Sequence, residues 1–271
     1  MVETAELIHH QSALLAPDTL VIAVSQSGRS AEILRLLELA RQSQMSVLGV
    51  SNSPGSPLAE RATACLLTQA GAETSVSCKT YVATLMALSW LGDVLCKLDL
   101  ATTRLELEQA SQLVRGYLAI WPAHIAWLKI GFKDARHIFL VGRGSSLAAV
   151  GTGALITKES THVHAEGMSS AAFRHGPMEM LAGDVVVVVF AGSGPGADLN
   201  RNLVLDLTAQ GGLAHLVDTH REPHVFHLPP APQRLLPMLE ILPVEMLTLA
   251  LGSLQGRTPG VFQHGAKVTT S

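Results

Sequence analysis

The sequence predicts an α/β protein with parallel sheets flanked by helices, and three observations lead to that prediction. Short apolar runs alternate with longer segments of helical periodicity along most of the chain. The run VVVVVF (Val185–Phe190) is apolar at consecutive positions, which is typical of a strand buried on both faces. The third observation is an internal repeat. Strands that alternate with helices form parallel layers.

Each expected element is either a short apolar run, interpreted as a strand, or a longer amphipathic segment, interpreted as a helix. The expected strands are, in chain order, Leu20–Val24, Val47–Val50, Ala64–Leu67, His137–Val141, Val185–Phe190, Leu213–Val217 and Val225–Leu228. The expected helices are Ala31–Gln42, Tyr81–Leu98, Arg104–Leu118, Leu147–Lys158, Leu199–Gln210 and Leu235–Leu254.

A shift of 166 residues aligns two segments without a gap, placing Ala5–Gly28 over Ala171–Gly194. The match includes turn residues as well as apolar ones, so we interpret the segments as two copies of one α/β unit. The second copy opens with the strand and helix between His137 and Glu159, whose partners in the first copy would precede Met1. We therefore expect a first copy that is incomplete at its N-terminus.

The expected domains are a first subdomain with connecting helices at residues 1–130, a second subdomain at 131–254, and a C-terminal tail at 255–271. With 48% apolar and 15% charged residues the chain is globular, and a net charge of −3 argues against a nucleic-acid partner. No run of apolar residues predicts a membrane span. Three cysteines without disulfide or metal-ligand spacing favour a cytoplasmic protein.

Two histidine pairs, His162-x-His164 and His224-x2-His227, have a spacing that could serve a metal. No cysteine or carboxylate completes either site, so we expect satisfied histidines in a strand or loop. We expect no metal and no cofactor.

The stretch SQSGRS (Ser25–Ser30) lies where an expected strand ends and a helix begins. Free N–H groups at a helix N-terminus attract anions, and Ser25, Gln26, Ser27 and Ser30 add side-chain donors. The structural alternative is that Ser30 only caps the helix. Capping needs one hydroxyl, however, whereas the loop has three hydroxyls and an amide. The loop therefore predicts a phosphate monoester site. The second copy has AGSGPG here and has lost most of these donors, so we expect one such site per chain.

The loop GRGSS (Gly142–Ser146) also follows a strand and precedes a helix, but it is a poor dinucleotide fingerprint because the third glycine is missing. We interpret it as a tight turn near the ligand, with Ser145 or Ser146 touching a sugar hydroxyl.

The segment GALITKESTHVHAEGMSSAAFRHGPMEML (Gly153–Leu181) contains Glu159 at a helix end and His175 in a tight turn. Taken singly, each residue is as readily structural as catalytic. Combined with SQSGRSAE and the closing HGAKVTTS, however, the segment resembles the sugar isomerase (SIS) family over nearly the whole chain. The likeness is to the isomerase half of glucosamine-6-phosphate synthase and to stand-alone amino-sugar-phosphate deaminases and isomerases.

The resemblance implies two tandem flavodoxin- or Rossmann-like SIS subdomains. It also implies that Ser25, Gln26, Ser27 and Ser30 hold the sugar phosphate. Glu159 would move a proton between C1 and C2, and His175 would open the sugar ring from the neighbouring subunit of a homodimer. Lys267 would engage the carbonyl end of the sugar. Ser77, in the segment AGAETSVSCKTY (Ala70–Tyr81), is a weaker substrate-binding candidate, as is Ser145.

The implied reaction is ketose–aldose isomerisation of a hexose phosphate or release of ammonia from an amino-sugar phosphate. No glutaminase domain is expected before the isomerase-like part, so no internal source of ammonia is expected. The family resemblance ranks glucosamine 6-phosphate first among the substrates. The synthase has a lysine three residues before its glutamate, where this chain has Ile156. The alternatives are a phosphosugar sensor without catalysis and an inactive fragment. A sensor would need the phosphate loop but not Glu159, His175 and Lys267.

Overall fold

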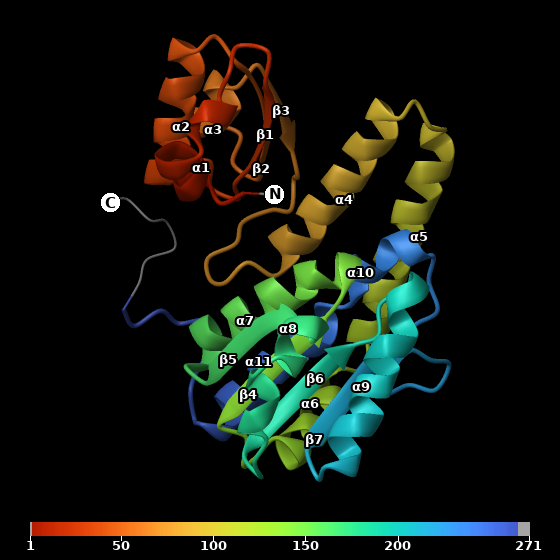
Figure 1. The fold of residues 1–271 in the computed structure, drawn as a ribbon. Helices are drawn as coiled ribbons and strands as arrows, with labels where there is room; N and C mark the ends of the chain where they lie inside the picture. The colour runs from red at the N-terminus through yellow and green to blue at the C-terminus, as the bar shows by residue number, and fades with distance from the viewer. Residues whose placement is uncertain (1, 265–271) are drawn as a thin grey trace. The chain divides into compact units, whose positions relative to one another are not determined.

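The computed structural model describes residues 2–264, which form two compact units. The first is built on residues up to Leu98 and the second on Asp99–Val261 (Figure 1). Both are α/β units with purely parallel sheets, one of three strands and one of five, as the sequence predicted. The division places the helices between Leu100 and Gly131 in the second unit, whereas the sequence analysis grouped them with the first.

The first unit has a sheet with the order β1-β2-β3, in which the strands run parallel and in register from Leu20 opposite Ser46. Its strands are β1 (Leu20–Val24), β2 (Ser46–Ser51) and β3 (Ala64–Leu67), and its helices are α1 (Thr4–His10), α2 (Ala31–Gln42), α3 (Pro57–Arg61) and α4 (Lys79–Leu95). One face packs on α1, α2 and α3 through a core that includes Ala23, Val47 and Leu36.

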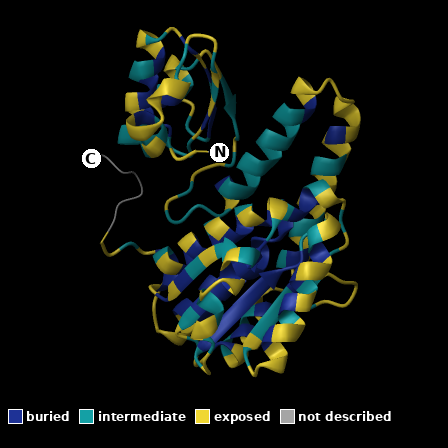
Figure 2. Ribbon diagram, viewed as in Figure 1, coloured by how far each residue is buried: buried dark blue, intermediate teal, exposed yellow. Residues whose placement is uncertain are grey.

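The second unit has a five-stranded sheet with the order β5-β4-β6-β7-β8. Its strands are β4 (His137–Gly142), β5 (His164–Ser169), β6 (Val185–Phe190), β7 (Leu213–Thr219) and β8 (His227–Leu228). Its helices are α5 (Leu100–Leu118), α6 (Trp121–Gly131), α7 (Leu147–Thr161), α8 (Ser170–Arg174), α9 (Ala197–Ala209), α10 (Leu236–Leu239) and α11 (Leu242–Leu254). All six residues of β6 are buried, which confirms the interpretation of VVVVVF (Figure 2).

Helices cover both faces of this sheet. Successive residues of a strand point to opposite faces. Leu140 of β4 and Val244 of α11 lie close to Gly153 of α7, so α7 and α11 share one face. Phe139, the preceding residue of β4, packs on Phe173 of α8 with ring centroids 5.2 Å apart. That second face also holds Leu203 and Leu207 of α9.

The repeat is visible in the two sheets. Leu20–Val24 (β1) shifted by 166 residues falls on Val186–Phe190 within β6, and α2 falls on α9. In the second sheet β6 pairs with β4, whereas β1 is at the edge of the first sheet, among the described residues. Among the described residues the first unit has no counterpart of β4 or α7, as the repeat predicted for its first copy, and none of β5, a strand that the sequence analysis did not expect. The register is lost after β7: residues 223–227, the counterparts of α3, form no helix, and residues 230–233, the counterparts of β3, do not form β8.

Several predicted elements differ from the structure. The strand expected at Val225–Leu228 is paired only over His227–Leu228, because Val225 and Phe226 belong to a turn buried in the core. The helix expected at Leu235–Leu254 divides into α10 and α11, because Pro243 has no N–H for the helical ladder. The sequence analysis missed β5 and four helices, namely α1, α3, α6 and α8.

Within residues 2–264, one helical stretch, Gln233–Leu254, is long and apolar enough to cross a membrane by length and composition. It is mostly buried inside the second unit, as is typical of a core helix.

Candidate functional site

The loop Ser25–Ser30 leaves the carboxyl end of β1 and leads into the first turn of α2. Each of its hydroxyls accepts a backbone N–H: Gly28 donates to Ser25 Oγ at 3.1 Å and Arg29 to Ser27 Oγ at 3.3 Å. Ile33 donates to Ser30 Oγ at 3.4 Å. Since a hydroxyl has one donor hydrogen besides its lone pairs, all three O–H groups remain available to a ligand.

Ser30 is therefore the N-cap of α2, as the alternative interpretation held. Capping uses the oxygen as an acceptor, whereas phosphate binding would use the hydrogen as a donor. The two roles are compatible in one residue. The half-buried Gln26 amide makes no hydrogen bond with the described residues, so its two N–H donors are also available.

Ser25 and Ser30 line a cavity of about 240 Å³ beside the N-terminus of α2. The carboxylates of Glu3 and Glu32 line the same cavity and would repel an anion that approached them. A phosphate group would therefore be held on the hydroxyl side, where the free N–H groups and the dipole of α2 favour negative charge.

A second loop, which follows β2, holds the loop Ser25–Ser30 in place through hydrogen bonds. The carbonyl of Gln26 accepts hydrogen bonds from the Asn52 backbone N–H at 3.1 Å and from Ser51 Oγ at 3.3 Å. The Arg29 guanidinium donates to the Gly55 carbonyl at 2.6 Å. Gly28 has a positive φ of 61°, and a Cβ there would collide with the Ser56 side chain, so this position requires glycine.

Asn52 connects this support to a third loop. Its Oδ1 accepts from Thr68 Oγ1 at 3.0 Å and from the Ala70 N–H at 2.8 Å, and its Nδ2 donates to the Gly71 carbonyl at 2.8 Å. The third loop follows β3 and contains Ser77. Because β1, β2 and β3 are parallel, their carboxyl ends and these three loops lie at one edge of the sheet.

Glu73 fixes the end of the third loop. Its Oε1 accepts the backbone N–H groups of Cys78 at 3.2 Å and of Thr80 at 3.3 Å, and its Oε2 contacts the Thr80 hydroxyl. These N–H groups are at the N-terminus of α4, which has no capping side chain at Cys78 itself. Glu73 thereby closes residues 73–80 into a compact loop in which Ser77 is half-buried.

In the second unit, Glu159 is half-buried near the C-terminal end of α7. Ile156, one turn earlier, is 1% exposed. It therefore packs in the core.

His175 is exposed and ends the short helix α8, whose Phe173 is fully buried and anchors the turn. Gly176 follows with a φ of 149°, which only glycine adopts readily. Glu159 and His175 lie on opposite faces of the five-stranded sheet, because α7 and α8 pack on opposite faces. The structure does not bring these two residues together within one subunit.

The GRGSS loop separates its two serines. Ser146 is buried and donates to Glu240 Oε1 at 2.8 Å, whereas Ser145 is exposed. Ser145 is therefore the one available to a ligand. Burial raises the pKa of Glu240 to about 7, and the hydrogen bond from Ser146 partly opposes that shift.

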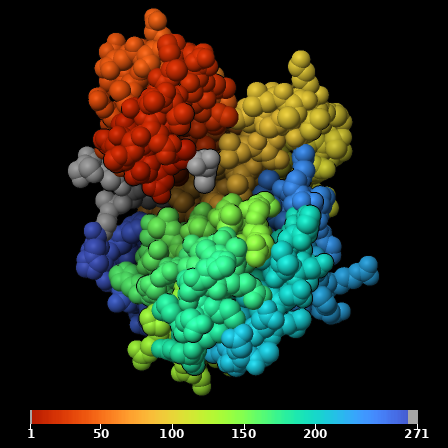
Figure 3. Space-filling view, in the orientation of Figure 1, coloured from red at the N-terminus to blue at the C-terminus, as the bar shows by residue number. Residues whose placement is uncertain are grey.

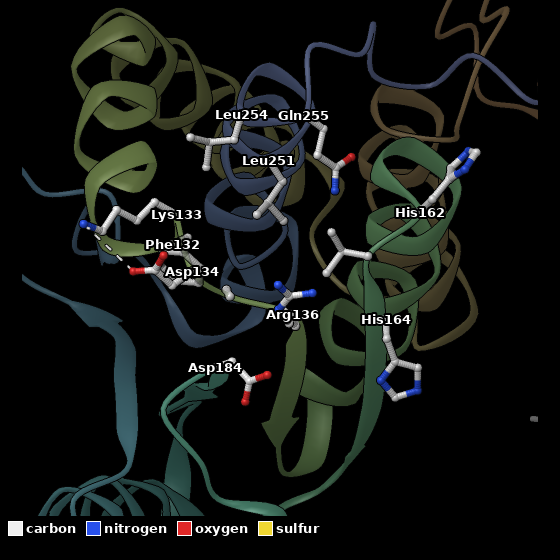
Figure 4. A pocket seen from close by; sticks show the side chains of 12 residues that line it. Phe132, Lys133, Asp134, Arg136, His162, His164, Asp184, Leu251, Leu254 and Gln255 are labelled. Atoms are coloured by element: carbon white, nitrogen blue, oxygen red, sulfur yellow. Dashed lines mark ion pairs between the residues drawn. The ribbon is translucent and has the colours of Figure 1, made fainter.

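The largest of the cavities described has a volume of about 700 Å³. It lies beside the amino ends of the strands of the second sheet (Figure 4). Its lining includes Arg136, His164 and Asp184, which lie at the amino ends of β4, β5 and β6. Ligands of open parallel sheets bind outside the carboxyl ends of the strands. The C-terminal ends of α6, α7 and α11 also face this cavity, and their carbonyl groups disfavour a phosphate.

Among the predicted site residues, the structure brings Ser25, Gln26, Ser27, Ser30 and Ser77 to one edge of the first sheet. Glu159, His175 and Ser145 belong to the second unit. Lys267 lies outside the described residues. Within residues 2–264, no group of three His, Cys, Asp or Glu side chains is arranged to hold a metal ion.

The SIS domain model matches residues 1–92 and 131–249, once in each unit. The chain belongs to the SIS domain family. The two matches confirm the tandem subdomains that the repeat predicted, and each covers a parallel sheet of this SIS protein.

The SIS chain is similar to longer proteins. One curated relative, the glutamine–fructose-6-phosphate aminotransferase (isomerizing) of Pyrococcus horikoshii, is 31% identical over 277 residues. The alignment covers 99% of this chain and 46% of the relative, so the chain spans about half the length of the curated relatives it matches.

Two solved structures share its fold. One is the C-terminal domain of glucosamine-fructose-6-phosphate aminotransferase from Francisella tularensis, with a TM-score of 0.83 and 23% identity, over 97% of this chain and 78% of that one. The other is glucosamine-6-phosphate deaminase from Thermotoga maritima, with a TM-score of 0.77 and 18% identity, over 98% of this chain and 80% of that one.

Sequence reasoning missed Asn52 and Glu73, which position the loops of the candidate site. Asn52 stands in SNSPGS directly after an expected strand, so its place at a strand's carboxyl end was a usable signal. Its partners, 16 to 19 residues further along, could not be read from the pattern.

Proposed function

We propose that this SIS protein binds a phosphosugar and interconverts its aldose and ketose forms, with glucosamine 6-phosphate to fructose 6-phosphate plus ammonia as the first candidate reaction. The observation that carries the proposal is the loop Ser25–Ser30, whose three hydroxyls accept hydrogen bonds internally and keep their own donors for a ligand. A phosphate monoester at a helix N-terminus uses that set of donors.

The proposed acid–base chemistry needs one group that carries a proton between adjacent carbons. A half-buried carboxylate such as Glu159 suits this role, because partial desolvation strengthens a carboxylate as a base. In the amino-sugar case, Glu159 takes the C2 proton of the open-chain aldose and returns it to C1. A proton passes from the C2 amine to the C1 oxygen, so that the C2–N bond becomes an imine and C1 a hydroxymethyl group. Water then adds to C2, and the C2–N bond breaks as the C2 ketone forms and ammonia leaves.

Ring opening precedes that step and needs a group that exchanges protons near neutral pH, for which His175 is the candidate. Lys267 would engage the carbonyl end of the sugar, as the family resemblance implies. Because Glu159 and His175 of one subunit lie on opposite faces of a sheet, we propose a homodimer in which His175 serves the neighbouring subunit's site.

The relatives support the choice of substrate class. The names of the P. horikoshii relative and of the T. maritima structure concern fructose 6-phosphate and glucosamine 6-phosphate. We extend that class to this chain and propose a cytoplasmic location, where such metabolites occur.

The test measures ammonia release and ketose formation in parallel over glucosamine, glucose, fructose and galactosamine 6-phosphates. Turnover of at least one substrate that is lost in Glu159→Gln, with binding of that substrate retained, is the expected result. A phosphosugar sensor is the competing function. It would bind one of these esters equally well before and after the Glu159→Gln substitution, and it would turn over none. Absence of binding by all four would overturn both functions.

A further inference from the structure

The position of His175 depends on the short helix that carries it. Its imidazole is exposed and makes no hydrogen bond with the described residues, and the residue is the C-cap of α8. α8 has only five residues, and a helix of that length is not stable by itself in water. Contacts with the rest of the second unit must therefore hold it. The buried ring of Phe173 is one such contact, and α9 provides two more, which are polar.

The first polar contact, the buried link, joins the start of α8 to α9. Ser170 Oγ donates to Asn200 Oδ1 at 2.8 Å, and both residues are fully buried. Asn200 Nδ2 in turn donates to the carbonyls of Phe190 at 2.8 Å and Ala191 at 3.1 Å, at the end of β6. A buried amide that is bonded at both of its polar atoms is held in one orientation. The buried link therefore ties α8 to the carboxyl end of the buried strand β6.

The second polar contact, the surface link, joins the end of α8 to α9. Arg174 Nη2 lies 2.5 Å from Asp206 Oδ2, and Arg174 directly precedes His175. Water screens an exposed ion pair, so this link contributes little to stability, but it restricts the last residue of α8. Both helices lie on the face of the second unit that is seen in Figure 3, α8 in green and α9 in cyan.

The first copy of the repeat packs the same pair of helices without either link. A shift of 166 residues places α1 over α8 and α2 over α9. Ile8 and Ala40 stand in place of the surface link and are buried in one apolar cluster. Thr4 and Leu34 stand in place of the buried link, and Leu34 is 39% exposed. Apolar packing can thus hold these helices, and the two polar links belong to the copy that carries His175.

We propose that Asn200 and Asp206 are positioning residues, which hold α8 so that the His175 imidazole reaches the ring oxygen of the sugar. This inference rests on the proposed function. Asn200 is fully buried, so it acts through α8 and not on the sugar itself. Proton transfer needs the imidazole within hydrogen-bond reach of its target, and a displacement of about 1 Å can cost roughly a hundredfold in rate.

The first test follows the His175 ring by NMR in the whole protein without a ligand. Ser170→Ala removes the buried link and leaves both donor bonds of Asn200, whereas Ser170→Thr keeps a hydroxyl. Asp206→Ala removes the surface link at an exposed position, and Asn202→Ala, at an exposed amide of α9, is the control. Relaxation of the His175 ring carbons should show a more mobile ring in Ser170→Ala and in Asp206→Ala. The ring should be as in wild type in Ser170→Thr and Asn202→Ala.

The second test measures turnover of the best phosphosugar with hydrogen or deuterium at C2. Removal of the C2 hydrogen is the step proposed for Glu159, whereas ring opening is the step proposed for His175. In Ser170→Ala we expect kcat to fall by at least about fivefold while KM changes less than about twofold. The isotope effect should fall toward one, because ring opening then limits the rate. Ser170→Thr should restore both values.

An unchanged His175 ring in both link variants would overturn the proposal, as would a mobile ring with unchanged kcat. An isotope effect that stays above one and does not fall would place the lost rate in the Glu159 step and would also overturn it. If wild type turns over no phosphosugar, the proposed function fails by itself. The NMR comparison needs no turnover and still decides whether the two links hold His175.

Discussion

Glu159 and His175 are only 16 residues apart in the chain, yet the five-stranded sheet stands between them. α7 carries Glu159 on the face that contains Leu140, and α8 places His175 on the face that contains Phe139. A sugar bound beside one of them is separated by a sheet layer from the other in the same subunit. We therefore expect acid–base catalysis that uses both residues to draw them from two subunits of the proposed homodimer.

Mixed dimers test that expectation. Glu159→Gln and His175→Ala should each be inactive alone, whereas unfolding and refolding them together should restore roughly a quarter of the wild-type activity, because half of the dimers are mixed and each has one intact site. Activity in a turnover assay on the best substrate checks this. No recovery in a mixture that sedimentation confirms as dimeric would assign both residues to one subunit's site.

Ser30 combines a structural and a ligand-binding role, and substitutions can separate them. Ser30→Ala should lower the free energy of unfolding by about 0.5–2 kcal/mol, the usual cost of a lost N-cap, and should also weaken phosphosugar binding. Ser30→Asp keeps a capping acceptor but places a negative charge beside the ligand phosphate. It should retain stability and lose binding.

The matched control for charge is Ser46→Asp, at the exposed amino end of β2 and the opposite edge of the sheet. Melting curves and calorimetric titration with glucose 6-phosphate measure both properties. Undiminished affinity in Ser30→Asp would remove Ser30 from the phosphate site.

Asn52 lies in the second loop and forms hydrogen bonds to both the first loop and the third loop. We therefore expect it to affect sugar binding. Asn52→Ala removes three hydrogen bonds to the segment Thr68–Gly71, and we expect a loss of about 1–3 kcal/mol in stability together with weaker phosphosugar binding. Asn52→Asp keeps the acceptor for Thr68 and Ala70 but turns the donor to the Gly71 carbonyl into a repelling oxygen.

The backbone N–H of Asn52, which bonds the Gln26 carbonyl, is unchanged in both variants. Inorganic phosphate, which needs only the loop Ser25–Ser30, should therefore bind both variants almost as well as wild type, while the sugar phosphate binds less tightly. An equal loss for the two ligands would contradict a role in positioning the third loop.

How far the sequence predicted the fold depended on whether the signal was local. The prediction gave the exact bounds of β1 (Leu20–Val24) and α2 (Ala31–Gln42). An apolar run and a capped amphipathic helix can each be recognised from a few neighbouring residues. Strand β5 was missed because HAEGMS is polar; it is an edge strand that pairs only with β4. Helix α6 was missed because WPAHIAWLKIG is apolar around its whole circumference.

The site divides in the same way. The donors of Ser25–Ser30 could be predicted from one loop between a strand and a helix. The roles of Asn52 and Glu73 could not, since each acts through hydrogen bonds to a separate stretch of chain. The separation of Glu159 from His175 by the sheet follows from the topology of the second unit. The local sequence around either residue does not show on which face of the sheet its helix packs.

Glu240 gives the last prediction, because it is a carboxyl group buried at 2% exposure beneath the GRGSS loop. Burial raises its pKa in the folded protein to about 7 from 4.5. A raised carboxyl pKa stabilises the fold where the group is protonated, so this contribution is complete below pH 4.5 and is lost as the pH rises through 7. The difference between pH 8 and pH 4.5 is on the order of 3 kcal/mol.

Glu240→Gln keeps an oxygen to accept from Ser146 and removes the ionisation. The variant should be more stable than wild type at pH 8 and nearly equal to it at pH 5, with a flatter pH profile in urea unfolding followed by circular dichroism. Glu222→Gln, an exposed carboxylate in the same unit, is the control and should leave the profile unchanged. A Glu240→Gln profile parallel to that of wild type would mean that Glu240 is already ionised in the folded protein at neutral pH.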